Sequence, residues 1–106
     1  MQLRYFFDPG SGVCLWAGDD AARDAFGYAV AFEDLSLSPD TVAIGNELLQ
    51  EFDGSIDWND PGSPSPWSTA QMQGFSDKAH AFLSRLRAEL GGGFEIIDAL
   101  GSTPNA

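Results

Sequence analysis

The segment STAQMQGFSDKAHAFLSRLRAELGGGFEIID, residues 68–98, carries the strongest structural pattern in the chain. Ser68 followed by Gln71 is typical of a capping box, which satisfies the first backbone N–H groups of a helix. Apolar residues then recur every three or four positions, which predicts an amphipathic helix over residues 69–90. This apolar stripe comprises Met72, Phe75, Ala79, Phe82, Leu83, Leu86 and Leu90. Three consecutive glycines end the helix, and FEIID at 94–98 predicts a last strand. The stripe is therefore expected to belong to the core.

A second long helix is predicted upstream, in SPDTVAIGNELLQEFDG at residues 38–54. Ser38 is a favourable N-cap, and Pro39 suits the first helical position. Asp40 lies at the positive end of the helix dipole, and Gly54 can close the last turn. One face of this helix is expected to be apolar and to comprise Val42, Leu48, Leu49 and Phe52.

The N-terminal part predicts a hairpin and a short helix. LRYFF at 3–7 and VCLW at 13–16 are strand-like runs, and the DPGSG between them is typical of a loop of about five residues. DDAARDAF at 19–26 predicts two helical turns that begin at Asp19 or Asp20 and stop at the glycine that follows.

The segment YAVAF at 28–32 alternates large and small residues, which favours a third strand, although a helical continuation remains open. The expected fold is α+β: a small, mostly antiparallel sheet with two long helices packed on one face. The sheet would contain the N-terminal hairpin, a possible middle strand and the C-terminal strand. Residues 1–100 are expected to form a single domain, and residues 101–106 a flexible C-terminal tail.

Charge is distributed unevenly along the 106 residues. The chain has 16 acidic and 5 basic side chains and a formal net charge of −11. Residues 17–66 hold 11 of the acids with Arg23 as their only base, so this middle part accounts for −10. A field of one sign repels phosphate backbones and anionic lipid and attracts basic partners. We therefore expect a protein partner with a basic surface and no direct nucleic-acid or membrane binding, with solubility alone as the alternative role.

The sequence shows no targeting or membrane-spanning pattern. No apolar run approaches the ~20 residues that a membrane span needs. The first ten residues lack the pattern of a secretory signal peptide. A single cysteine, Cys14, rules out an internal disulfide framework and fits a reducing compartment. These observations indicate a cytoplasmic protein.

Metal and catalytic chemistry receive little support from the sequence. DWNDPG at 57–62 partly matches a calcium loop, but Pro61 occupies a ligand position and Ser68 replaces the closing acidic ligand. One cysteine and one histidine cannot complete a four-ligand zinc site, so neither metal nor cofactor is expected. Cys14 is most simply a buried apolar residue and His80 a flanking helix residue. A small enzyme that uses Cys14 and His80 stays as an alternative.

The connection SIDWNDPGSPSPWS, residues 55–68, is unusual because 14 residues contain two tryptophans, two aspartates and three prolines. Long connections inside small domains are uncommon and often functional. An exposed tryptophan beside aspartates suits a basic partner, whereas both tryptophans could instead cover the helix ends. We expect Trp67 to be buried and Trp58 to be presented. The candidate partner-binding residues are Asp53, Asp57, Trp58 and Asp60.

Four stretches together carry a resemblance to a known group of proteins: RYFFDPGSGVCLW, DLSLS, IDWNDPGSPSPW and LRAELGGGFEI. Over residues 4–98 the chain resembles small, acidic bacterial proteins of the cytoplasm that look like immunity proteins of polymorphic or contact-dependent toxin systems. The resemblance implies a non-enzymatic binder that neutralises a cognate toxin, and the acidity would suit a nuclease-type toxin domain. The alternatives are an acidic protein-interaction module and a DNA-mimic-like inhibitor of a basic partner.

Overall fold

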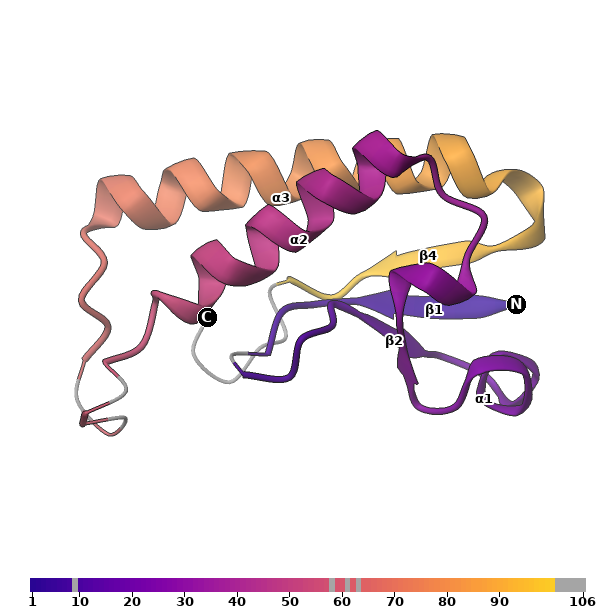
Figure 1. Ribbon diagram of the computed structural model, residues 1–106, viewed down its shortest axis with the longest axis horizontal. Helices are drawn as coiled ribbons and strands as arrows, with labels where there is room; N and C mark the ends of the chain where they lie inside the picture. The colour runs from indigo at the N-terminus through magenta and orange to yellow at the C-terminus, as the bar shows by residue number, and fades with distance from the viewer. Residues whose placement is uncertain (9, 58, 61, 63, 101–106) are drawn as a thin grey trace.

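The computed structural model describes residues 1–8, 10–57, 59–60, 62 and 64–100. In these residues four strands form one sheet and three α-helices accompany it (Figure 1). The elements are β1 (Gln2–Tyr5), β2 (Leu15–Ala17), α1 (Asp20–Phe26), β3 (Ala29–Val30), α2 (Pro39–Asp53), α3 (Thr69–Leu90) and β4 (Glu95–Asp98). Two 3-10 helices, η1 (Phe32–Asp34) and η2 (Gly91–Gly93), precede α2 and β4 respectively. The α+β class predicted from the sequence is confirmed. The proposed tail, residues 101–106, lies outside the described residues.

The sheet has the strand order β3-β2-β1-β4 and is mixed. β1 pairs antiparallel with β2, and β2 pairs antiparallel with β3. β4 pairs parallel with β1, with Leu3 opposite Ile96, so one of the three pairings departs from the antiparallel pattern. The reason lies in the helices between them. α2 leads the chain across the sheet and α3 brings it back, so β4 enters at the end where β1 begins (Figure 1).

The two long helices lie on one face of the sheet, as expected (Figure 1). Leu3 and Tyr5 of β1 are fully buried toward the helices, whereas Arg4 between them is exposed. The Tyr5 hydroxyl donates a hydrogen bond of 2.8 Å to the Ala79 carbonyl oxygen of α3. This bond satisfies a buried phenol and ties the middle of α3 to the sheet. Burial raises the pKa of Tyr5 far above its ordinary value, so the phenol stays protonated.

The opposite face of the sheet carries the third tryptophan, Trp16, beside Arg4 in the strand register. Its ring stacks on Phe6 with the ring centres 4.9 Å apart and contacts Tyr28 at 5.2 Å. The indole N–H donates to the Phe6 carbonyl oxygen over 3.1 Å. Trp16 is therefore buried by its own neighbours, and Tyr28 remains exposed at the edge of this stack.

The α2 helix begins as predicted, because the Ser38 hydroxyl accepts from the Thr41 backbone N–H and Pro39 occupies the first turn. Its buried residues, however, are Thr41, Gly45 and Leu48. The other residues of the predicted apolar face are only partly buried: Val42, Leu49 and Phe52. A small residue explains the difference. A Cβ on Gly45 would come within 2.6 Å of the Phe32 ring and 2.8 Å of the Phe82 ring. Glycine therefore lets α2 approach both rings closely.

The α3 helix has the predicted capping box between Ser68 and Gln71. Five stripe residues are buried: Phe75, Ala79, Phe82, Leu83 and Leu86. Leu90 is half-buried, and the assignment of Met72 to the core was wrong, because its side chain is 44% exposed. Met72 lies in the first turn of α3, beyond the part that the sheet covers (Figure 1). Gly91 ends the helix with φ +64°, a left-handed conformation that favours glycine.

The N-terminal elements are shorter than predicted. Regular pairing of the hairpin stops at Tyr5, although Phe6 N–H still donates to the Cys14 carbonyl oxygen over 3.1 Å. Asp19 caps α1 by accepting from Ala22 N–H over 2.8 Å, and its other oxygen accepts from Gln2 N–H. Within residues 28–32 only Ala29–Val30 forms a strand, so the strand interpretation is correct and the helical one is not.

Candidate functional site

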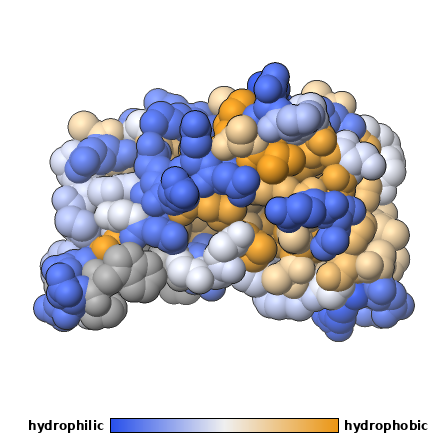
Figure 2. All heavy atoms as spheres, in the orientation of Figure 1, coloured by the Kyte–Doolittle hydropathy of each residue, from blue (hydrophilic) through white to orange (hydrophobic). Residues whose placement is uncertain are grey.

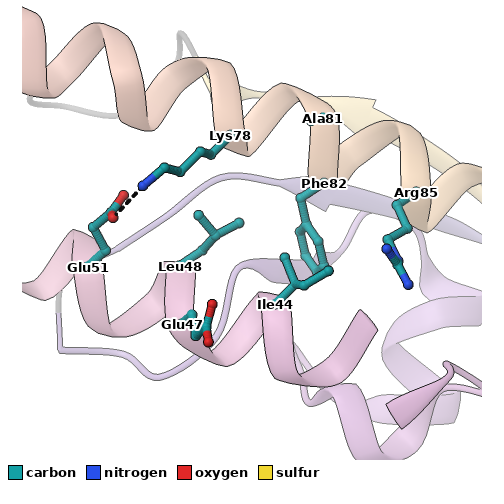
Figure 3. Close-up of a pocket in the computed structure, with 8 residues that line it drawn as sticks. All are labelled: Ile44, Glu47, Leu48, Glu51, Lys78, Ala81, Phe82 and Arg85. Carbon is teal, nitrogen blue, oxygen red and sulfur yellow. Dashed lines mark hydrogen bonds and ion pairs between the residues drawn. The ribbon is translucent and has the colours of Figure 1, made fainter. Parts of the chain in front are cut away.

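The face shown in Figure 2 has α2 in front and carries a hydrophobic area bordered by hydrophilic side chains. A groove of about 340 Å³ lies between α2 and α3. Figure 3 shows side chains of both helices converging on this groove. The lining residues are Ile44, Glu47, Leu48 and Glu51 from α2 and Lys78, Ala81, Phe82 and Arg85 from α3.

The groove arises from helical spacing in both elements. The lining positions in α2 follow the spacing i, i+3, i+4 and i+7, and those in α3 repeat it. Residues at this spacing share one helix face. One face of α2 and one face of α3 therefore line the groove. Leu48 and Phe82 are buried and form its apolar floor, whereas Ile44 is half-buried and Ala81 is exposed. The small Ala81 side chain leaves room that a longer one would fill.

Charged side chains of opposite sign line the two walls of the groove. Lys78 Nζ lies 2.9 Å from Glu51 Oε1, and this pair bridges the groove (Figure 3). Both side chains remain open to water, with 61% of Lys78 and 38% of Glu51 exposed. Glu47 is exposed and forms no ion pair with any residue that the structure describes. Of the two carboxylates on the α2 wall, Lys78 therefore neutralises Glu51, and the negative charge of Glu47 remains.

Arg85 closes the other end of the groove. Its Nε donates to Thr41 Oγ1 over 2.6 Å and lies 3.5 Å from Glu89 Oε2. Glu89 also accepts hydrogen bonds from the Ser38 backbone N–H, the Ser38 hydroxyl and the Thr41 hydroxyl. The bond from the Ser38 backbone is the main cause that lowers the pKa of Glu89 below its ordinary value. A carboxylate from α3 thus sits at the positive N-terminal end of α2.

The candidate residues that follow α2 occupy different environments. Asp53 is half-buried at the last position of α2, and its Oδ1 accepts from Gly10 N–H over 2.9 Å. Asp57 is exposed, and its Oδ1 accepts from Asn59 N–H over 3.0 Å in a tight local turn. Asp60 is exposed and donates its backbone N–H to the Asp57 carbonyl oxygen. Trp58 lies outside the described residues.

An aromatic cluster lies where the connection joins α2 and α3. Trp67 is half-buried, and its ring centre lies 5.3 Å from that of Phe75 and 6.2 Å from that of Phe52. Phe7 joins the cluster, with its ring centre 5.4 Å from Phe52 and 5.1 Å from Phe75. Trp67 therefore packs on the ends of α2 and α3, although it is half-buried and not fully buried as we expected.

The two residues of the alternative catalytic pair have other neighbours. Cys14 is fully buried in the hydrophobic core, and burial raises the pKa of its thiol, so the thiolate is disfavoured. His80 is exposed on α3, where Nδ1 lies 2.8 Å from the Ser76 carbonyl oxygen and Nε2 lies 3.4 Å from Asp98 Oδ2. The surroundings of Cys14 are those of a structural residue.

Residues 2–98 match a protein-family model described as Serratia CdiI immunity protein-like. The chain belongs to this family. The match runs from the start of β1 to the end of β4, so it includes the groove and the connection at residues 55–68. No curated protein matches the sequence.

The groove of this immunity protein-like chain was not foreseen from the sequence. Its signal was nevertheless present, because Glu47 and Glu51 are four residues apart on one helix and Lys78 and Arg85 are seven apart on the other. Each pair marks a charged helix face. Which faces meet depends on how the helices pack, and sequence spacing does not specify that.

Two further properties of this family member concern metals and membranes. Within the described ranges, no three histidine, cysteine or acidic side chains come together as metal ligands would. None of the helices described for the chain has the length and apolarity that crossing a membrane requires.

Proposed function

We propose that this protein neutralises a cognate bacterial toxin by binding it directly, and that it does so without catalysis of its own. The observation that carries the proposal is membership of an immunity protein-like family over residues 2–98. Immunity proteins act on a toxin protein, so the partner we propose is a toxin domain. We further propose that its contact surface is basic, as in the substrate groove of a nuclease, because the chain carries a net charge of −11.

The end of α2 supports an electrostatic role for the residues after it. The C-terminal end of a helix is its negative end, where basic side chains are stabilising. The last turn of α2 has no basic residue and ends on Asp53, and Asp57 and Asp60 follow it. These acids add to the negative end of the helix instead of offsetting it. Such an arrangement does little for the stability of the helix and attracts a basic partner.

The cytoplasm is the compartment that we propose for this encounter. The chain has one cysteine, and Cys14 is buried and unpaired in the structure. An unpaired buried thiol fits a reducing compartment.

The proposal is tested by stopped-flow binding to the inactivated toxin domain that an affinity pull-down with this protein recovers from its host. The first variant combines Asp57→Asn with Asp60→Asn. Exposed charges contribute about 0–1 kcal/mol to stability, so its thermal melt should stay close to that of the wild type. Association should slow and its salt dependence should flatten, because long-range attraction acts mainly on the association rate.

The control for this variant removes the same charge from α1, by Asp20→Asn with Asp24→Asn, at the far end of the molecule from the connection (Figure 1). Association rates that fall equally in both variants would assign the effect to total charge and not to Asp57 and Asp60. A wild-type protein that does not bind the toxin domain at all would overturn the proposed function.

The two tryptophans of the connection separate binding from folding. Trp58→Ala should speed dissociation by more than about tenfold if the lost contact exceeds about 1.4 kcal/mol. Trp67→Ala should chiefly lower the unfolding free energy, because Trp67 packs on Phe52 and Phe75. If Trp58→Ala merely unfolds the protein, Trp58 is a structural residue and not a binding residue.

A further inference from the structure

We infer that the groove between α2 and α3 receives a lysine or arginine side chain of the toxin, and this inference rests on the proposed function. The groove is partly open to solvent and has a volume of about 340 Å³. Sites for whole small molecules range over about 300–1,000 Å³, so this groove is at the small end. A single long side chain with its flanking backbone is the occupant that fits.

The floor and the walls match the two parts of a long basic side chain. Ile44, Leu48 and Phe82 provide an apolar surface along the groove. Lysine and arginine lay their methylene stems on such surfaces while the charged head stays near water. Figure 3 shows Glu47 and Glu51 on the α2 wall, beside that apolar floor. A stem on the floor would therefore place its head within reach of a carboxylate.

The pattern of ion pairs in the groove favours a cation over an anion. Arg85 already contacts Thr41 and Glu89, and Lys78 already contacts Glu51. Glu47 is the groove carboxylate without an ion pair in the described part of the chain. An acidic side chain would be repelled by this carboxylate. A basic one would meet Glu47 directly.

The Lys78–Glu51 pair is also replaceable. Exposed ion pairs contribute about 0–1 kcal/mol, and both side chains of this pair are partly exposed. An incoming cation can take the place of the Lys78 ammonium at Glu51 with little loss, and the freed lysine returns to water. The groove thus offers two carboxylates four residues apart, one open and one exchangeable.

The test fills the groove at Ala81, which is exposed and lines it. Ala81→Met adds length without charge, and Ala81→Arg adds both length and a positive charge. Each should raise the Kd for the toxin domain by about tenfold or more, mainly through faster dissociation. Ala25→Met and Ala25→Arg are the matched controls, because Ala25 is exposed on the distant helix α1. Neither control should change binding.

A second arm removes the open carboxylate. Glu47→Gln keeps the size of the side chain and should raise Kd by about fivefold to tenfold, whereas Asp24→Asn on α1 should leave it unchanged. Because Glu47 is exposed, this variant remains informative even if Ala81→Arg lowers stability.

The outcomes separate the inference from the function on which it rests. A wild type that binds while all Ala81 and Glu47 variants bind equally well overturns the groove and leaves the toxin-binding role intact. Weaker binding by Ala81→Arg with unchanged binding by Ala81→Met overturns it too, because long-range repulsion then explains the result. A wild type that does not bind the toxin domain overturns both.

Discussion

At the scale of the single residue, Gly45 determines how closely α2 approaches the rest of the molecule. The rings of Phe32 and Phe82 occupy the space in which any other residue would place its Cβ. Packed interiors tolerate added atoms poorly, because their side chains already sit in favourable conformations. Gly74 on α3 provides the contrast, since a Cβ there would meet nothing within 4 Å.

Alanine at position 45 and alanine at position 74 should therefore change the unfolding free energy in opposite directions. Alanine is favoured over glycine inside a helix by about 1 kcal/mol, so Gly74→Ala should raise the unfolding free energy by about 0.5–1 kcal/mol. Gly45→Ala gains the same helix propensity, but its Cβ forces the rings of Phe32 and Phe82 to move. It should therefore lower the unfolding free energy by about 1–2 kcal/mol net. Urea melts of the two variants measure both values. Equal stabilisation by both changes would show that the rings shift freely.

Glu89 makes a residue-scale prediction about acid. Hydrogen bonds from Ser38 and Thr41 lower its pKa in the folded state below its ordinary 4.5, so the unfolded chain binds the proton more readily. The stabilising contribution of Glu89 is therefore complete above pH 4.5 and is lost as pH falls through the folded-state pKa. Glu89→Gln should destabilise the protein at pH 7, and the difference from wild type should shrink in acid. A difference that stays constant from pH 7 to pH 3 would contradict this.

At the scale of the element, α3 contributes five buried side chains to the core. Leu86 is fully buried in its stripe, so Leu86→Ala should lower the unfolding free energy by about 2–5 kcal/mol. Met72→Ala in the same helix should change it by less than about 0.5 kcal/mol, because this side chain is exposed. Urea denaturation checks both values. A loss below about 1 kcal/mol at Leu86 would mean that the buried face of α3 is wrongly assigned.

The elements were predictable where their signals are local. Caps at Ser38 and Ser68 and the stop at Gly91 are read from neighbouring residues, and all three are confirmed. Burial was less predictable, because it depends on what covers a residue. The spacing places Met72 on the stripe of α3, but its side chain is exposed. The parallel pairing of β4 with β1 was missed for a related reason, since it joins strands more than 90 residues apart in the chain.

At the scale of the whole molecule, the charge and the groove differ in how far the sequence reveals them. The acidic excess of residues 17–66 is visible in the composition, and it motivates the proposed basic partner. The groove depends on the distance between two helices, which Gly45 and the rings around it set. Asp57 and Asp60 are exposed as a binding role requires, whereas Asp53 also holds the N-terminal turn through Gly10. Their role in binding stays a prediction.

The pairing of the first strand with the last has a consequence for the synthesis of the protein. β1 lies inside the sheet, and one of its two sides is filled only when β4 arrives. A ribosome adds ~5–20 residues per second, so β1 waits about 5–20 s for its final neighbour. A nascent chain that ends before residue 95 has α3 but no strand to complete the layer beneath it. The complete sheet therefore forms only after β4 has been synthesised. If the proposed function holds, only molecules completed before the toxin arrives can neutralise it.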